Sequence, residues 1–372
     1  MSANNIPIFI SAGDPSGDIA GSLLLNELKN KNENFLFLGL GGERMRRAGQ
    51  EQLVDGSELA VLGFWEVAKK AFFFKKILRD AVRMIEERRP KAVILIDYPG
   101  FNLRLAERIK PLGIPIIYYI SPQVWAWASG RIEQIKRLVD KMLLILPFET
   151  DIYDKAGVPN EFVGHYLLDD IDPQYIKAPY NPDSNLILLM PGSRPQEVQR
   201  MLPTLIKSAE ILSQRGDYRF AVAAVEGNID YDAYMKQSRT PIEVIKGRTR
   251  QLIAESRLVV TSSGTATLET GIIGRPMIVI YRTGMITYMI ARRLVKLTMI
   301  ALINISAGKK IVPELIQGEA RPENIAAEAD KFLQDDKYCR GVINQLNSIT
   351  EKLAESGASA KAAEAIMRIV NC

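Results

Sequence analysis

The segment ILIDYPGFN, Ile94–Asn102, places a carboxylate where an apolar run ends. The apolar residues lead directly into Asp97, and Pro99-Gly100 then turns the chain. A short, wholly apolar run is typical of a strand buried on both faces. In open α/β sheets, ligands bind at the carboxyl ends of such strands. Asp97 is therefore either a reactive carboxylate or an ordinary turn residue beside the proline.

The segment VVTSSGTATLETG, Val259–Gly271, has the pattern of a phosphate site. An apolar run ends in small hydroxyl residues and glycine, and a helical pattern follows. Free backbone N–H groups and the positive end of a helix favour an anion there. The predicted ligand contacts are Ser263, Gly264, Thr265, Thr267 and Glu269, the last placed to accept from ribose hydroxyls. The alternative is a plain Ser/Thr cap with the glutamate on a solvated face.

The segment LLMPGSRPQEV shows the same pattern of an apolar run, a glycine-containing turn and a helix at the end of another expected strand. Gly192 and Ser193 provide a tight turn and a helix cap. Arg194 follows at the carboxyl end of the strand, where a guanidinium can hold a diphosphate through two hydrogen bonds. The alternative is a structural arginine paired with Glu197.

The first strand–helix turn carries a third glycine-containing loop. Gly13, Ser16 and Gly17 precede a helical pattern, and Asp18 lies near its start. The loop is not GxGxxG, so nicotinamide or flavin binding has no support and no organic cofactor is expected.

An aromatic and basic helical segment stands apart from these loops. Phe72, Phe73 and Phe74 are consecutive and lead into Lys75 and Lys76, with two more lysines just before them. Each residue turns a helix by about 100°, so three adjacent rings cannot all face a core. This pattern is typical of contact with a lipid surface, and a core helix with a ragged edge or a dimer interface are the alternatives. Tyr288–Ile300 has a similar pattern.

Strand-like runs alternate with amphipathic stretches along most of the chain, which predicts parallel sheets with helical crossovers. The first series of expected strands is 8–12, 35–40, 92–97, 114–120 and 142–146, and the second is 185–190, 220–225, 242–245, 258–262 and 277–281. A Pro/Asp/Asn-rich linker separates them. We expect two Rossmann-like doubly wound α/β domains facing a cleft, over 1–168 and 169–345, and a helical tail, 346–372, packing back on the first.

Composition narrows the class of protein. A chain of 372 residues exceeds one ordinary core, which favours two domains. One histidine and two cysteines offer neither a zinc pattern nor a disulfide scaffold, so no metal is expected. The net charge of +5 favours anionic partners, but no basic cluster is interleaved with aromatics as nucleic-acid modules require. No signal peptide or apolar run of about 18 residues is evident, which predicts a cytoplasmic protein.

Ten motifs occur in order along the chain. They are GDPSGD, GLGGERMRRAG, ELAVLGFWEV, IDYPGFN, SPQVWAW, LPFE, FVGH, PGSRPQEV, SSGTATLE and the late YRTG…ARRLVK…NISAGKKIVPELIQ, spanning Ser11 to about Gln317. Together they resemble the lipid-A-disaccharide synthase family, inverting glycosyltransferases of family 19. The resemblance implies a GT-B fold, UDP-2,3-diacylglucosamine as donor and 2,3-diacylglucosamine 1-phosphate (lipid X) as acceptor. It also implies peripheral attachment to the cytoplasmic face of the inner membrane and homodimers with exchanged C-terminal parts.

The same resemblance implies residue roles. Asp97 matches the family's general base, Arg194 the residue that neutralises the leaving diphosphate, and Asn304 a late motif asparagine. Ser263–Glu269 matches the nucleotide-binding segment.

The chain departs from the family pattern at a few positions. Asp14 stands where glutamate is usual, Gly100 where aspartate is common, Tyr166 where proline often follows the histidine, and Ile303 where proline precedes the asparagine. Gly100 calls into question a secondary polar contact that the family pattern would place beside the base.

Three other functions compete with this interpretation. Two are enzymes that use UDP-sugars on the same fold, a MurG-like transferase and a UDP-sugar 2-epimerase. The third is a non-enzymatic nucleotide-sugar binding protein. The phenylalanine run disfavours an epimerase, which needs no lipid surface, and the missing export signal disfavours a receptor.

Overall fold

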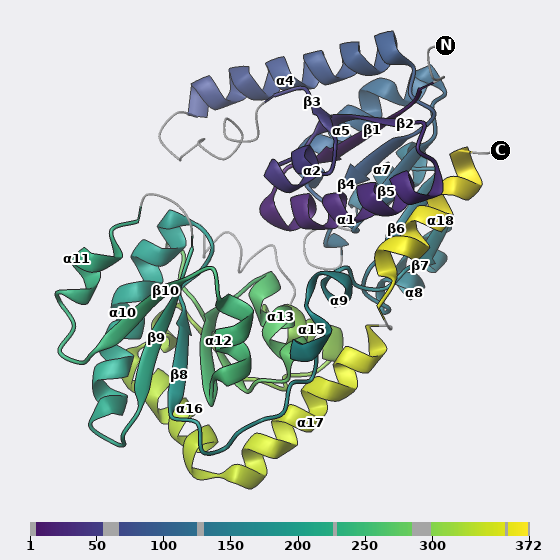
Figure 1. Ribbon diagram of the computed structural model, residues 1–372. Helices are drawn as coiled ribbons and strands as arrows, with labels where there is room; N and C mark the ends of the chain where they lie inside the picture. The colour runs from purple at the N-terminus through teal and green to yellow at the C-terminus, as the bar shows by residue number, and fades with distance from the viewer. Residues whose placement is uncertain are drawn as a thin grey trace. The chain divides into compact units, whose positions relative to one another are not determined.

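The computed structural model describes residues 5–54, 67–124, 130–225, 229–284, 299–353 and 356–370, without the side chains of 67–72. The chain divides into two compact units, shown in Figure 1. Unit 1 comprises Met1–Asp170 and Leu353–Cys372, and unit 2 comprises Ile171–Lys352. Each contains one parallel sheet with helices, which confirms the predicted class of two Rossmann-like domains.

Unit 1 has a seven-stranded sheet in the order β3-β2-β1-β4-β5-β6-β7. The strands are β1 Ile6–Ala12, β2 Phe35–Leu40, β3 Glu51–Gln52, β4 Val93–Ile96, β5 Ile116–Tyr119, β6 Lys141–Leu144 and β7 Asn160–Phe162. The helices are α1 Pro15–Lys31, α2 Glu43–Arg47, α4 Val67–Arg88, α5 Pro99–Ile109, η1 Lys110–Leu112, α7 Gly130–Leu138, α8 Glu149–Ala156, α9 Leu167–Asp170 and α18 Ala358–Val370. All pairs in the sheet are parallel.

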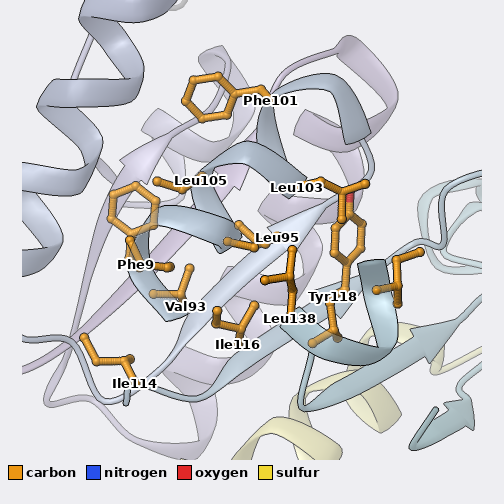
Figure 2. Packing of buried hydrophobic residues seen from close by; sticks show 14 of the residues in the cluster. Phe9, Val93, Leu95, Phe101, Leu103, Leu105, Ile114, Ile116, Tyr118 and Leu138 are labelled. Atoms are coloured by element: carbon orange, nitrogen blue, oxygen red, sulfur yellow. The ribbon is translucent and has the colours of Figure 1, made fainter. Parts of the chain in front are cut away.

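The core of unit 1 forms where helices cover the central strands. Every residue of β4 is fully buried, which explains its unbroken apolar sequence. Figure 2 shows Phe9 of β1, Val93 and Leu95 of β4, and Tyr118 of β5 in one cluster with α5 residues. The buried centre of the sheet therefore carries the end of β4, where Asp97 lies.

The C-terminal helix α18 belongs to unit 1 and packs against α1, as Figure 1 shows. The Asp169 carboxylate accepts from the backbone N–H of Gly357 and from that of Ser359 at 2.7 Å, so it caps α18. The Leu353 carbonyl accepts from the His165 N–H at 3.2 Å. The boundaries between the two compact units lie after Asp170 and after Lys352. The sequence analysis expected these boundaries at 168 and 345.

Unit 2 has a six-stranded parallel sheet in the order β10-β9-β8-β11-β12-β13. The strands are β8 Leu186–Met190, β9 Arg219–Ala224, β10 Ile242–Lys246, β11 Leu258–Ser262, β12 Met277–Tyr281 and β13 Glu314–Ile316. The helices are η2 Pro173–Tyr175, α10 Pro195–Ser213, α11 Tyr231–Met235, α12 Thr249–Glu255, α13 Thr265–Ile273, α15 Leu302–Ala307, η3 Gln317–Glu319, α16 Pro322–Gln334 and α17 Asp336–Lys352.

Both sheets reverse their strand order at a central pair. In unit 1 the pair is β1 and β4, with Ala12 opposite Ile96. In unit 2 it is β8 and β11, with Met190 opposite Thr261. At such a reversal the two following loops diverge and leave a crevice at the carboxyl ends, which is where doubly wound sheets bind ligands.

Candidate active site

Asp97 lies at the reversal point of unit 1. It follows β4 directly, and its backbone N–H donates to the Tyr119 carbonyl at 3.1 Å, continuing the ladder with β5. The Gly13 loop follows the neighbouring strand β1. A β-carbon at Gly13 would lie 2.2 Å from the Tyr98 ring, so only glycine fits against that ring. The turn after β1 and the turn after β4 therefore pack tightly together.

The pKa of Asp97 is raised from 3.8 to about 7, first by burial and then by the nearby negative charge of Asp14. The Tyr98 backbone N–H lowers it to a smaller degree. A carboxyl with a pKa near 7 can both take up and release a proton at neutral pH, which a general base must do.

The Gly13–Asp18 loop forms the start of α1. Asp14 is the N-cap of this helix: its carboxylate accepts from the Gly17 N–H at 2.9 Å and from the Ser16 hydroxyl. A β-carbon at Gly17 would lie 2.7 Å from the Asp14 carboxylate, which explains the glycine. Ser16 and Gly17 thus shape the turn around Asp14.

The Asp18 carboxylate is occupied within the chain. It accepts from the backbone N–H groups of Gly42 at 2.8 Å, Arg44 at 3.0 Å and Met45 at 3.0 Å. These donors form the start of α2, where backbone N–H groups have no partner within the helix. Asp18 therefore links α1 to α2 by accepting hydrogen bonds from them. A direct ligand role for Asp18, expected from the sequence, would require these bonds to be replaced.

The turn after β8 presents Arg194 at the reversal point of unit 2. Gly192 has φ of 125°, a conformation that favours glycine. The Glu197 carboxylate accepts from the N–H groups of Ser193 at 2.9 Å and Arg194 at 3.3 Å, which fixes the turn. The Arg194 side chain is 70% exposed and lies 3.7 Å from Glu197, so the weak ion pair leaves its guanidinium available to a ligand.

The turn after β11 leads into α13 beside this arginine-bearing turn. The helix begins after Gly264, whose φ is 147°, and has no side-chain cap. The Ser263 hydroxyl donates to the Ile300 carbonyl at 2.9 Å, and the Thr267 hydroxyl donates to the Gly264 carbonyl at 2.8 Å. Thr265 is half-buried at the first helical position. Two of the three predicted hydroxyl donors therefore bond within the chain, while the uncapped helix end remains suited to an anion.

Glu269 is paired with a residue that the sequence analysis did not single out. The Arg250 Nε donates to the Glu269 carboxylate at 2.7 Å, and their side chains are 25% and 18% exposed. Arg250 lies in α12, just past the carboxyl end of β10. Arg250 could have been found in the sequence as a basic residue at the start of a helix that follows a strand.

Asn304 lies fully buried in α15. Its amide donates to Glu314 at 2.8 Å and to the Val312 carbonyl at 2.9 Å, and it accepts from the N–H groups of Ile311 and Val312. All its hydrogen-bonding capacity is thus used to hold the segment before β13. The resemblance assigns Asn304 to the substrate site, and that role stays a prediction.

The aromatic helix α4 has an inner and an outer face. Phe73 and Phe74 are half-buried and pack against the core of unit 1, with the Phe74 ring 5.2 Å from the Phe101 ring. Lys75 and Lys76 are exposed. The side chain of Phe72 lies outside the described residues, as do the two preceding lysines and 285–298 in the other aromatic-basic segment. Within the described part of the chain, no helix combines the length and apolarity needed to cross a membrane.

The departures from the family pattern are structurally accommodated. Gly100 has open space where a β-carbon would stand, so this position tolerates a side chain as well. Tyr166 is buried and stacks on the His165 ring at 4.8 Å. Ile303 is buried against Gly271.

Solved structures resemble this fold at low sequence identity. A UDP-N-acetylglucosamine 2-epimerase from Listeria monocytogenes, described as putative, has a TM-score of 0.66 at 13% identity and covers 98% of this chain and 96% of its own. The calicheamicin glycosyltransferase CalG4 has a TM-score of 0.62 at 14% identity, covering 100% and 99%. Together with the two parallel sheets, these likenesses establish the GT-B fold and say nothing of the substrate.

Sequence comparison is far more specific. A lipid-A-disaccharide synthase from Anaeromyxobacter dehalogenans (strain 2CP-1 / ATCC BAA-258) is 40% identical over 372 residues, covering 98% of this chain and 97% of the relative. The family described as lipid-A-disaccharide synthetase matches residues 8–370. The resemblance seen in the motifs is thereby confirmed, and the chain belongs to the lipid-A-disaccharide synthetase family.

Proposed function

We propose that the chain is an inverting glycosyltransferase that makes the lipid A disaccharide. It joins UDP-2,3-diacylglucosamine to 2,3-diacylglucosamine 1-phosphate, giving UDP and the β-1,6-linked disaccharide 1-phosphate. Membership of the family supports the reaction, and the observation that carries the mechanism is the half-buried carboxyl of Asp97 with its pKa of about 7.

Asp97 is the general base of this proposal. It takes the proton of the acceptor 6-hydroxyl while that oxygen attacks the anomeric carbon of the donor. The new carbon–oxygen bond forms as the bond from the anomeric carbon to the diphosphate breaks, and UDP leaves with the electron pair. Attack on the face opposite UDP inverts the anomeric centre.

Unit 2 binds the donor nucleotide in this proposal. The exposed Arg194 guanidinium and the uncapped start of α13 neutralise the diphosphate, whose charge grows as the bond breaks. Glu269, held by Arg250, accepts from the ribose hydroxyls. Positive charge and N–H donors from the protein thus stabilise the leaving group.

We further propose that α4 attaches the protein peripherally to the cytoplasmic face of the inner membrane. Lys75, Lys76, Arg79 and Arg83 are exposed, while the opposite face of α4 packs on the core. A cationic outer face attracts anionic lipid, where both acylated substrates reside.

We also propose that the chain forms homodimers with exchanged C-terminal parts. Light scattering on the purified chain tests whether it is a dimer.

The reaction is tested by UDP release with donor and acceptor supplied singly and together. A disaccharide synthase forms UDP only when both lipid monosaccharides are present, with a new disaccharide on thin-layer chromatography. An epimerase interconverts the UDP-sugar alone, and a binding protein releases no UDP. UDP release without acceptor would contradict the proposal.

A further inference from the structure

The chain turns sharply between β4 and α5 through two residues in an unusual conformation. Asp97 and Tyr98 have φ of 42° and 46°, the left-handed region that residues other than glycine seldom adopt. Neither residue is glycine, so the surrounding structure must hold this turn in place. The proposed general base is thus one of the strained residues.

The carbonyl oxygen of Asp97 is held by two side chains. The Asn102 Nδ2 donates to it at 2.8 Å, and the Tyr118 hydroxyl donates to it at 2.6 Å. Two donors use both lone pairs of this oxygen, so the peptide plane between Asp97 and Tyr98 cannot rotate without losing both bonds.

The two donors are themselves fixed by the core. Tyr118 is fully buried in β5 and stands beside Leu103 in Figure 2. Burial raises its pKa well above the ordinary value, so the hydroxyl stays protonated and acts as a donor. Asn102 is also fully buried, and the Ser11 hydroxyl donates to its Oδ1 at 2.7 Å, which fixes which end of the amide faces Asp97.

We propose that Asn102 and Tyr118 are positioning residues that hold the strained Asp97–Tyr98 turn and thereby keep the Asp97 carboxyl in its half-buried, reactive place. This inference rests on the proposed role of Asp97 as the base. The two residues touch no substrate in this role; they act through the main chain of Asp97. Without them the turn relaxes toward an ordinary conformation, and the carboxyl moves toward solvent.

The test compares Tyr118→Phe with Tyr119→Phe in the full-length protein. The control removes an equally buried hydroxyl from the next residue of β5, on the face of the sheet where Ser359 and Asp169 lie. We expect Tyr118→Phe to lower kcat by roughly 10- to 100-fold, because a small misplacement of a catalytic group is costly. KM for both substrates and the affinity for UDP should stay unchanged.

The pH profile separates positioning from a general loss of structure. When the carboxyl becomes more solvated its pKa falls, so the acid limb of kcat/KM, which reports the substrate-free protein, should move below pH 7 in Tyr118→Phe and stay in place in Tyr119→Phe. A milder variant, Ser11→Ala, removes only the bond that orients Asn102 and should move the limb in the same direction. It keeps the inference testable if Tyr118→Phe does not fold.

Equal kcat and an equal acid limb in the two tyrosine variants would overturn the positioning role. So would a Ser11→Ala limb that stays at the wild-type pH. If the proposed role of Asp97 as the general base is wrong, a different result is expected: Asp97→Asn would retain turnover. An inactive Asp97→Asn beside a normal Tyr118→Phe rejects the positioning role alone.

Discussion

Replacing Asp97 by asparagine should abolish turnover and at the same time stabilise the protein at alkaline pH. An amide keeps the shape of the carboxyl but cannot take a proton, so the acceptor hydroxyl is not activated. The amide also carries no charge, and the structure places this charge where burial and Asp14 disfavour it.

The magnitude follows from the pKa of Asp97. The gap between about 7 in the folded protein and 3.8 is about 4 kcal/mol at ~1.36 kcal/mol per pKa unit. Above pH 7 the carboxyl is ionised in both the folded and the unfolded state, so this cost to the free energy of unfolding is fully present. As the pH falls through 7, the folded state binds a proton and the unfolded state does not, so the cost shrinks and is gone near pH 4.

The assay is thermal unfolding of both proteins at pH 8 and pH 5, with UDP release measured in parallel. Asp97 is partly solvated, so we expect about 2 kcal/mol of the full cost, or about 4–8 °C in the transition of a unit of this size at pH 8. The advantage of Asp97→Asn should be much smaller at pH 5. An equal difference in transition temperature between the two proteins at pH 8 and at pH 5 would refute the argument that the charge of Asp97 is disfavoured in the folded protein. Near-normal turnover of Asp97→Asn would rule Asp97 out as the base.

Three further predictions concern the charges around the two reversal points and on α4. Asp14→Asn should move the acid limb of kcat/KM to lower pH, because the Asp14 charge raises the pKa of the proposed base; an unmoved limb contradicts this. Arg194→Ala should weaken binding of UDP but not of uridine, whereas Glu269→Ala should weaken both, as calorimetry can measure; equal loss of uridine affinity in the two variants rejects this division. Changing Lys75 and Lys76 together to Gln should reduce binding to anionic vesicles by roughly 30-fold, at about 1 kcal/mol per lysine, and leave binding to neutral vesicles unchanged. If sedimentation with anionic vesicles is unaffected, the lipid contact lies elsewhere.

The sequence alone was sufficient for the fold class and for the family. Every expected strand is present, because strands buried on both faces are continuous apolar runs that alternate with amphipathic helices. The short strands β3, β7 and β13 were missed because each has only two or three residues and no apolar run. Asp97, Arg194 and Glu269 were predicted as site residues because each follows a strand end and sits in a recognisable motif, and their roles stay predictions.

Only the tertiary structure decided what these side chains contact. A motif states that a residue lies near a strand end, and it does not state which atoms approach from distant parts of the chain. Asp18 bonds to the start of α2, Asn304 to the segment before β13, and Glu269 to Arg250, all through contacts that no local pattern encodes.

The same holds for the proposed base. The pKa of Asp97 depends on burial and on Asp14, which lies 83 positions earlier in the numbering, and the left-handed turn is held by Tyr118 from another strand. Strand order brings these groups together, because β1, β4 and β5 are neighbours in the sheet. Sequence therefore determined which residues could do the chemistry, and packing of the sheet determined how they are held and charged.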